Sequence, residues 1–313
     1  MLAYIASHPI CWPTSGYLER KYVPCVPSLL GFLDGILFHL SSTPRIEGAP
    51  SRVSGQLITI TGRPVQGKII DFRINLVGPI QSDRTDANGF FAGELSAPLA
   101  EISVPDGSDH PKIAPIGWLY VLPGATIDLG SISFDNSTIN KPQARLRGPI
   151  RLVELPQRST ANAGKIAALV IACSGPVQDY CDRNTLTVIH GDGSAAEPIA
   201  DKNQIRVSSP MISEDGSTAG WLANEPFCCT SYPIATRLAV YIPTKPLRMF
   251  NGDGRAIFKW KFIFNGEQVA FYQDFLHGTP AQHYELRDVS TGRLISKWDG
   301  ELTGKASTWT KGL

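Results

Sequence analysis

The sequence of 313 residues lacks an excess of charge of either sign, because 29 lysines and arginines are matched by 28 aspartates and glutamates. This balance removes the basic surface with which proteins wrap nucleic acid or bind an anionic membrane. The sequence also lacks an uninterrupted apolar run of about 20 residues, the length that a transmembrane helix requires. We therefore expect no nucleic-acid partner and no stable transmembrane span.

Motifs of common enzyme classes are missing as well. The chain contains no G-x-S-x-G, H-E-x-x-H, Walker loop or G-x-G-x-x-G, and residues 252–254 are only a turn. None of its six cysteines has the C-x-x-C spacing of a zinc or thioredoxin-type site. The sequence therefore predicts no cofactor and no resident metal.

Glycine and proline, in contrast, are abundant. The 29 glycines and 24 prolines lie between short apolar runs, and 42% of the residues are hydrophobic, which is enough to bury a core. Short apolar runs separated by turn residues are typical of strands. The composition therefore predicts an all-β protein.

Residues 1–50 differ from the rest and have the layout of a secretory signal. Arg20 and Lys21 precede an apolar stretch at 26–40, and small polar residues follow it. Asp34 within the stretch is unusual for a signal core, and a short buried or interfacial helix is the alternative. We expect this leader or signal-like segment to direct export to the periplasm or outside the cell.

Residues 52–135 carry the pattern of a first β domain. Ile70, Phe72, Ile74 and Leu76 alternate with polar residues, as in a strand with one face in a core. The T-D-A-N-G sequence at 85–89 then predicts a tight hairpin, because Asn-Gly tolerates positive φ angles. A calcium loop is not expected here, since the D-x-[DN]-x-[DN]-G order with a distal glutamate is not met.

The order V-S-G at 53–55, G-R-P-V at 62–65, T-D-x-N-G-x-F at 85–91 and G-A-T-I-D-L-G from residue 124 resembles the carboxypeptidase regulatory-like domain. The resemblance covers about 85 residues. It implies a transthyretin-like β-sandwich that serves as an extracytoplasmic accessory module without catalysis of its own.

Residues 145–313 contain two similar stretches. Aligning Asp215-Gly216 with Asn265-Gly266 superposes two strand-turn-strand units at an offset of 50 residues, and each is followed by another such unit. The segment 185–194 is predicted to be part of an earlier copy. A period of 40 to 50 residues built from four short strands is typical of propeller blades.

The S-x-D-G-x-x-x-G-W and F-x-N-G-x-x-V-A-F sequences, with the Y-E-L-R-D-V-S-T-G-R-L ending, resemble the WD40-like repeats of TolB-type periplasmic propellers. Closed propellers typically have at least four blades, and this region holds fewer. The predicted fold is therefore all-β, with a transthyretin-like β-sandwich and a partial, blade-like antiparallel β region, an incomplete propeller.

Two cysteine pairs are disulfide candidates. Cys173 and Cys181 flank a turn-rich loop that can bring its ends together, and their oxidation would stabilise an exported protein by about 2 to 3 kcal/mol. Cys228 and Cys229 are adjacent and could form a strained ring. Alternatively, one of them packs in the core while the other stays free or pairs elsewhere.

A catalytic site is the alternative to a binding role. Asp274, His277 and His283 could supply three metal ligands, and either histidine could activate Cys228 or Cys229 as a nucleophile. A polar loop between two strands is the simpler interpretation. Trp221, Trp260 and Trp298 could form an aromatic platform, although core positions are more usual for them.

The sequence thus favours an exported bacterial, non-enzymatic binding or accessory protein whose partner is a protein or glycan of the cell envelope. Its binding surface would be loops that include residues 228–233 and 274–283. The alternative is a hydrolase or thiol-dependent enzyme that uses Cys228 or Cys229 with His277 or His283. A purely structural or assembly module differs from the first interpretation only in its partner.

Overall fold

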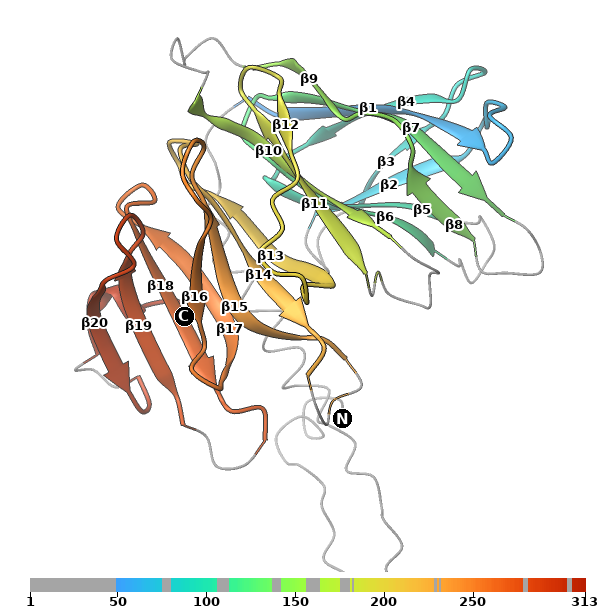
Figure 1. The fold of residues 1–313 in the computed structure, drawn as a ribbon. Helices are drawn as coiled ribbons and strands as arrows, with labels where there is room; N and C mark the ends of the chain where they lie inside the picture. Colours follow the sequence, from blue (N-terminus) through green and yellow to red (C-terminus); the bar gives the residue numbers. More distant parts are fainter. Residues whose placement is uncertain are drawn as a thin grey trace, which may run out of the picture. The chain divides into compact units, whose positions relative to one another are not determined.

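Strands account for nearly all of the regular structure in the computed structural model of this protein (Figure 1). The structure describes residues 49–313 except 75–79, 106–112, 137–141, 156–163, 175–180, 182, 228–229, 231, 278–280 and 303–305. Residues 46–311 form one compact unit. The predicted leader therefore lies almost entirely outside the described residues. Within these, the one named helix is a short 3-10 turn, η2 (Thr308–Thr310), and no helix is long and apolar enough to cross a membrane.

The first sheet has five strands, and its hydrogen-bonded order is β4-β1-β7-β8, with β9 also pairing to β7. Its strands are β1 (Ser51–Thr59), β4 (Phe90–Leu95), β7 (Thr126–Asp135), β8 (Gln143–Leu146) and β9 (Arg151–Glu154). β1 and β7 run parallel, whereas the other pairs are antiparallel.

The second sheet has seven strands in the order β12-β11-β10-β6-β5-β2-β3, all antiparallel. They are β2 (Ile69–Ile74), β3 (Ile80–Arg84), β5 (Leu99–Pro105), β6 (Ile113–Val121), β10 (Ile166–Cys173), β11 (Asn184–His190) and β12 (Ala195–Ala196). The pairing of β10 with β6 carries this sheet across the domain boundary that the sequence predicts between 135 and 145. Residues 166–196 therefore extend the same sheet as residues 69–121.

These two sheets enclose the first hydrophobic core. The predicted alternation is confirmed on β2, where Ile70, Phe72 and Ile74 are buried and their neighbours are half-buried. Phe72 packs against Phe91 of the opposite sheet with ring centroids 6.1 Å apart. Period-two burial on facing strands is what a β-sandwich requires.

The turn at 85–89 is confirmed, but the predicted hairpin is wrong. Gly89 has a φ of +78°, and the Asp86 carboxylate accepts hydrogen bonds from the Asn88 and Phe90 amides at 2.8 and 2.9 Å. The flanking strands, however, belong to different sheets, because β3 pairs with β2 while β4 pairs with β1. The turn thus carries the chain from one layer of the sandwich to the other.

β10 is buried on both of its faces. Ala168 and Val170 belong to the sandwich core, whereas Leu169 and Ile171 belong to a second core on the other side of the sheet. Its sequence is correspondingly apolar without interruption, as expected for a strand covered on both sides.

Two four-stranded antiparallel sheets follow, with orders β13-β14-β15-β16 and β17-β18-β19-β20. The first consists of β13 (Arg206–Ile212), β14 (Ala219–Glu225), β15 (Ile234–Tyr241) and β16 (Arg248–Asn251). The second consists of β17 (Ala256–Ile263), β18 (Gln268–Asp274), β19 (His283–Asp288) and β20 (Leu294–Asp299). Gly216 and Gly266, with φ of +72° and +92°, lie in the first turn of each sheet, as the 50-residue alignment predicts.

The two blade-like units are therefore confirmed. The predicted third partial unit at 185–194 is wrong, because this segment forms β11 and pairs with β10 in the seven-stranded sheet. The described residues hold two four-stranded sheets, fewer than the four or more blades of a closed propeller.

Apolar side chains pack between the last three sheets. Trp221 of β14 is completely buried in the second core, which it shares with Leu169 of β10. Leu238 of β15 and Phe271 of β18 lie in a third core, between the two four-stranded sheets. Each sheet thus packs on the next one along the chain, and the middle sheets are covered on both faces.

Candidate functional site

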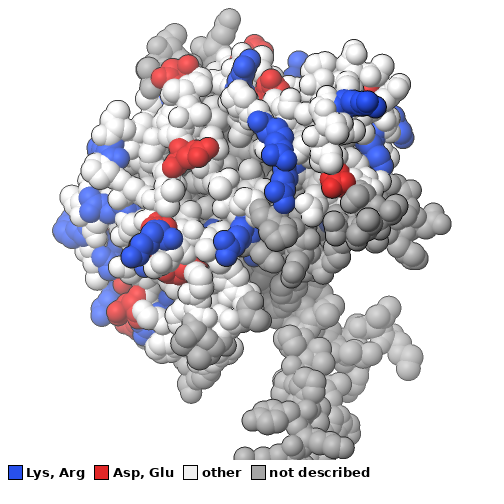
Figure 2. Space-filling view, turned by 45° about the vertical axis from the view of Figure 1, so that its right-hand side comes forward, with Lys and Arg blue, Asp and Glu red and all other residues white. Residues whose placement is uncertain are grey.

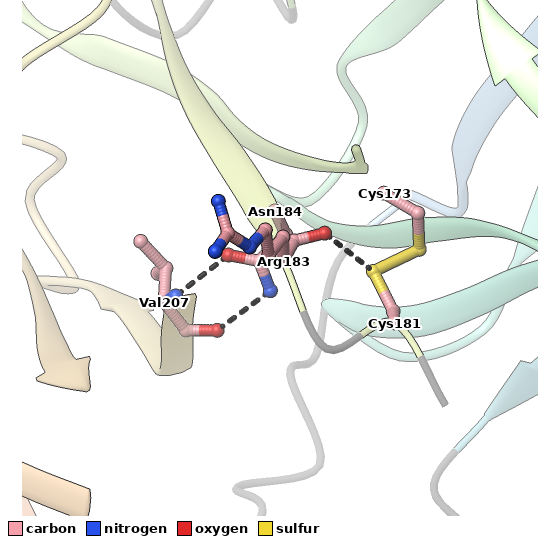
Figure 3. The surroundings of a disulfide bond; sticks show 5 residues. All are labelled: Cys173, Cys181, Arg183, Asn184 and Val207. Carbon is pink, nitrogen blue, oxygen red and sulfur yellow. Dashed lines mark hydrogen bonds between the residues drawn. A yellow bond between two sulfur atoms is a disulfide. The ribbon is translucent and has the colours of Figure 1, made fainter. Parts of the chain in front are cut away.

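Cys173 and Cys181 form a disulfide, as predicted, with their Cα atoms 5.3 Å apart (Figure 3). Cys173 ends β10, and Cys181 lies just before β11. Beside this bridge, the buried Asn184 side chain forms two hydrogen bonds with the backbone of Val207 in β13, at 2.6 and 3.0 Å (Figure 3). The disulfide closes the β10–β11 connection, and Asn184 joins that connection to the following sheet.

The predicted thiol site lies largely outside the described residues, since these include neither Cys228 nor Cys229. His277 is described, and its side chain is exposed. A thiol-dependent reaction with His277 or His283 therefore stays a prediction.

Asp274 fixes the conformation of its own loop. Its carboxylate accepts hydrogen bonds from the amides of Phe275 and Ala281, both at 2.7 Å, and from the Tyr272 hydroxyl at 2.9 Å. Burial and this neighbouring carboxylate raise the pKa of Tyr272. Since both of its oxygens are engaged, Asp274 acts here as a loop-closing residue.

His283 lies between two carboxylates at the other end of the same loop. Its Nδ1 bonds to Asp299 on β20, and its Nε2 lies 3.1 Å from Glu285, which also pairs with Arg287. Residues 283, 285 and 287 alternate along β19 and so share one face of the sheet. The hydrogen bond from His283 lowers the pKa of Asp299.

The imidazole thus bonds to a carboxylate through each ring nitrogen, and Arg287 extends this row of polar contacts through Glu285. Within the described part of the chain, no three His, Cys, Asp or Glu side chains are placed to hold a metal ion, so Asp274, His277 and His283 do not assemble into one.

A second charged network surrounds Arg237 on β15. Its guanidinium donates to Asp201 at 2.6 Å and lies 3.3 Å from Glu225, which also accepts from the Thr236 hydroxyl. The hydrogen bond to Asp201 raises the pKa of Arg237. These contacts neutralise Arg237 beside the end of β14.

Two pockets lie next to these networks, on either side of β16. The first has a volume of 570 Å³ and is lined by Glu225, Phe227, Thr236, Arg237, Met249, Asn251, Gly252, Asp253, Gly254 and Arg255. The second has a volume of 420 Å³ and is lined by Arg248, Met249, Phe250, Asn251, Asp253, Glu285, Arg287, Thr291 and Gly292. Met249, Asn251 and Asp253 line both, so the pockets adjoin along this strand.

The pockets lie near the loops in which the sequence predicts a binding surface. Phe227, next to Cys228 in the chain, lines the first pocket and is 40% exposed. Arg255 of the same pocket lies over the ring of Phe275, 4.9 Å from its centroid. The three tryptophans do not form a platform, because Trp221 and Trp260 are buried in two different cores.

Sequence reasoning missed these pockets. Their lining comes from four strands and three connections that are distant in the sequence, and residues 252–254 indicate only a turn when they are considered alone. Figure 2 shows lysine and arginine interspersed with aspartate and glutamate on one face of the molecule, which agrees with the near-zero net charge.

Comparison with known proteins gives limited guidance. No protein-family model and no curated protein matches the chain. Among solved structures, TolB from Acinetobacter baumannii is similar with 14% identity, 77% coverage of this chain, 66% coverage of TolB and a TM-score of 0.26. A 9R-lipoxygenase from Cyanothece PCC8801 follows with 10% identity, 87% and 46% coverage, and a TM-score of 0.19. Both similarities are weak, and neither assigns a function to this chain.

Proposed function

We propose that this protein is an exported bacterial, non-enzymatic binding or accessory protein of the cell envelope, and that its partner is a protein. The observation that carries the binding role is the pair of adjoining pockets beside β16, with volumes of 570 and 420 Å³. They combine apolar side chains with charged groups, which is the mixture found where proteins recognise partners.

The disulfide supports the location. Disulfides persist in secreted and periplasmic proteins and are rare in the cytosol, where thiols are kept reduced. The Cys173–Cys181 bridge therefore favours an oxidising compartment.

The location can be tested in cells of the native host by fractionation followed by alkylation. We expect the protein in the periplasmic or secreted fraction, with Cys173 and Cys181 protected from maleimide until a reductant is added. A cytosolic protein whose two thiols both react at once would contradict export.

The binding role can be tested by photo-crosslinking in the same cells. A photoreactive residue at Phe227 or Thr291, one in each pocket, is expected to yield the same crosslinked partner. The matched control is Ile60 in the sandwich region, which is 68% exposed and distant in sequence from both pockets. Equal crosslinking from all three positions, or none from the pocket positions, would contradict the proposal.

A further inference from the structure

The outer edge of β16 has hydrogen-bonding groups that point away from its sheet. Among the described strands, β16 pairs only with β15. The Gly252 amide donates to the Thr236 carbonyl at 3.0 Å, which makes this pair a hydrogen-bonded one. Because such pairs alternate in antiparallel ladders, Phe250 also faces β15, whereas Met249 and Asn251 direct N–H and C=O outward.

The same two residues connect the pockets. Met249 packs against the second core, which contains Leu169 of β10 and Trp221 of β14. Phe250 belongs to the third core, between the two four-stranded sheets. Side chains on β16 therefore alternate between two faces of the sheet, and Met249 and Asn251 line both pockets at the edge between those faces. An added strand would likewise alternate its side chains between the two pockets.

The second pocket presents the guanidinium groups of Arg248 and Arg287 together with the carboxylates of Glu285 and Asp253. Glu285 already accepts from His283 and Arg287, so its charge is compensated. Arg248 donates one bond to the Ser290 carbonyl at 2.6 Å and lines the pocket together with Arg287. Guanidinium groups bind carboxylates in particular, through paired, charge-assisted hydrogen bonds.

The first pocket has a more apolar wall. Phe227 and Met249 contribute apolar surface, and the Arg255 guanidinium lies over the ring of Phe275. Arg237 in this pocket is neutralised by Asp201 and Glu225. An aliphatic or aromatic side chain fits this surface better than a second carboxylate does.

We propose that the edge of β16 is a strand-addition site for an extended segment of the partner protein. The segment pairs antiparallel with Met249 and Asn251, places apolar side chains in the first pocket and acidic side chains in the second. This inference rests on the proposed binding function and deepens it, because it specifies the chemistry of the partner. In such complexes main-chain hydrogen bonds supply affinity and the alternating pockets supply specificity.

Labelled peptides test the pairing on the intact, unmodified protein. The probe is acetyl-Thr-Glu-Leu-Glu-Leu-Thr-amide, measured by fluorescence anisotropy. In the added strand, residues directly opposite Met249 and Asn251 have their side chains on the same face as these two residues. The leucines take these positions, so their amides are the ones that bond to β16. N-methylation of both leucines is expected to weaken binding roughly tenfold or more, whereas N-methylation of both glutamates leaves it within about threefold.

Two variants test the edge and the charge. Met249→Pro removes an outward N–H but no bond to β15, and is expected to weaken the unmethylated peptide roughly tenfold. Arg248→Gln is expected to abolish the preference for this peptide over its Glu-to-Gln analogue. Arg293→Gln, an exposed arginine that does not line either pocket, is the control and should bind as the wild type does.

Several results would overturn the inference. These are equal binding of the two N-methylated peptides, no binding of the unmethylated peptide at 1 mM, or a stable dimer that Met249→Pro dissociates. The last outcome would make a second copy of this chain the occupant. The peptide comparison uses the wild-type protein, so it remains decisive if Met249→Pro fails to fold. Peptide failure together with crosslinking at Phe227 would reject strand addition alone, whereas failure of both would also reject the binding function.

Discussion

At the scale of single residues, a few polar side chains substitute for backbone pairing where two sheets meet. Asn184 lies in β11, and its amide group pairs with both the N–H and the C=O of Val207 in β13. A neighbouring strand would offer Val207 the same combination of one donor and one acceptor. The side chain thus satisfies the Val207 backbone next to the point where the Asn184 backbone amide itself donates to the Ile205 carbonyl at 3.3 Å.

Asn184→Ala is therefore expected to lower the free energy of unfolding by roughly 2 to 4 kcal/mol, because it leaves two buried backbone groups without partners. Urea unfolding monitored by circular dichroism measures the change. Asn203→Ala, at an exposed turn position, is the control and should change the stability by less than about 0.5 kcal/mol. Equal effects of the two substitutions would show that the Asn184 bonds contribute nothing.

At the scale of elements, aspartates organise several turns in the same way. In the β19–β20 turn, the Asp288 carboxylate accepts bonds from the Thr291 hydroxyl and amide and from the Ser290 hydroxyl. The bond from the Thr291 side chain is the largest of the effects that lower the pKa of Asp288. Its ionised form is therefore the one that the turn stabilises.

This shift predicts a pH dependence. A carboxyl with a lowered folded-state pKa stabilises the protein above its unfolded value of about 3.9, and this contribution disappears as the pH falls through the folded pKa. The stability difference between the wild type and Asp288→Asn should thus be constant from pH 7 to 5 and shrink toward pH 2. Urea unfolding across this range measures it, with Glu301→Gln as an exposed control. A difference that grows on acidification would contradict the assignment.

The disulfide acts at the same scale, on the connection between β10 and β11. Closing a loop with a sequence separation of 8 is expected to contribute about 2 to 3 kcal/mol in the chain-entropy treatment. Reductant should lower the urea midpoint of the wild type, whereas the Cys173→Ala/Cys181→Ala double variant should show no such response. A wild-type midpoint that is the same with and without reductant would argue against this role of the bridge.

At the scale of the whole molecule, packing density differs among the strands. β10 has strand neighbours on both edges and a hydrophobic core on both faces, whereas β20 lies at the edge of the last sheet and is largely exposed. Strands with buried faces and two neighbours open least often. The stability of the fold is therefore expected to be greatest at β10.

Native-state hydrogen exchange tests this expectation. The amides of residues 166–173 should be among the slowest to exchange, and those of residues 294–299 among the fastest in any strand. β5 is a useful internal reference, since it has two strand neighbours but a single adjoining core. Exchange in β10 as fast as in β20 would mean that the seven-stranded sheet opens at this point.

Much of the fold follows from local sequence patterns. Alternation on β2 identified one strand and its buried face, and the turns at Gly216 and Gly266 identified the two four-stranded sheets. The short spacing of Cys173 and Cys181 pointed to their disulfide. These features depend on neighbours within about ten residues, and local geometry limits such segments to few conformations.

Which strands pair with one another over long sequence distances was decided only by the tertiary structure. The apolar sequence of β10 shows that both of its faces are buried, but not that β6 is its neighbour across a predicted domain boundary. The turn at 85–89 predicts a reversal, yet not that its strands enter different sheets. The pockets beside β16 combine residues 225 to 292, so no local pattern contains them. The sequence by itself determined the all-β class and several of the strands, because side-chain alternation and turn chemistry are local. The tertiary structure decided which edges pair and which stay open, because those choices depend on burying surface contributed by distant parts of the chain.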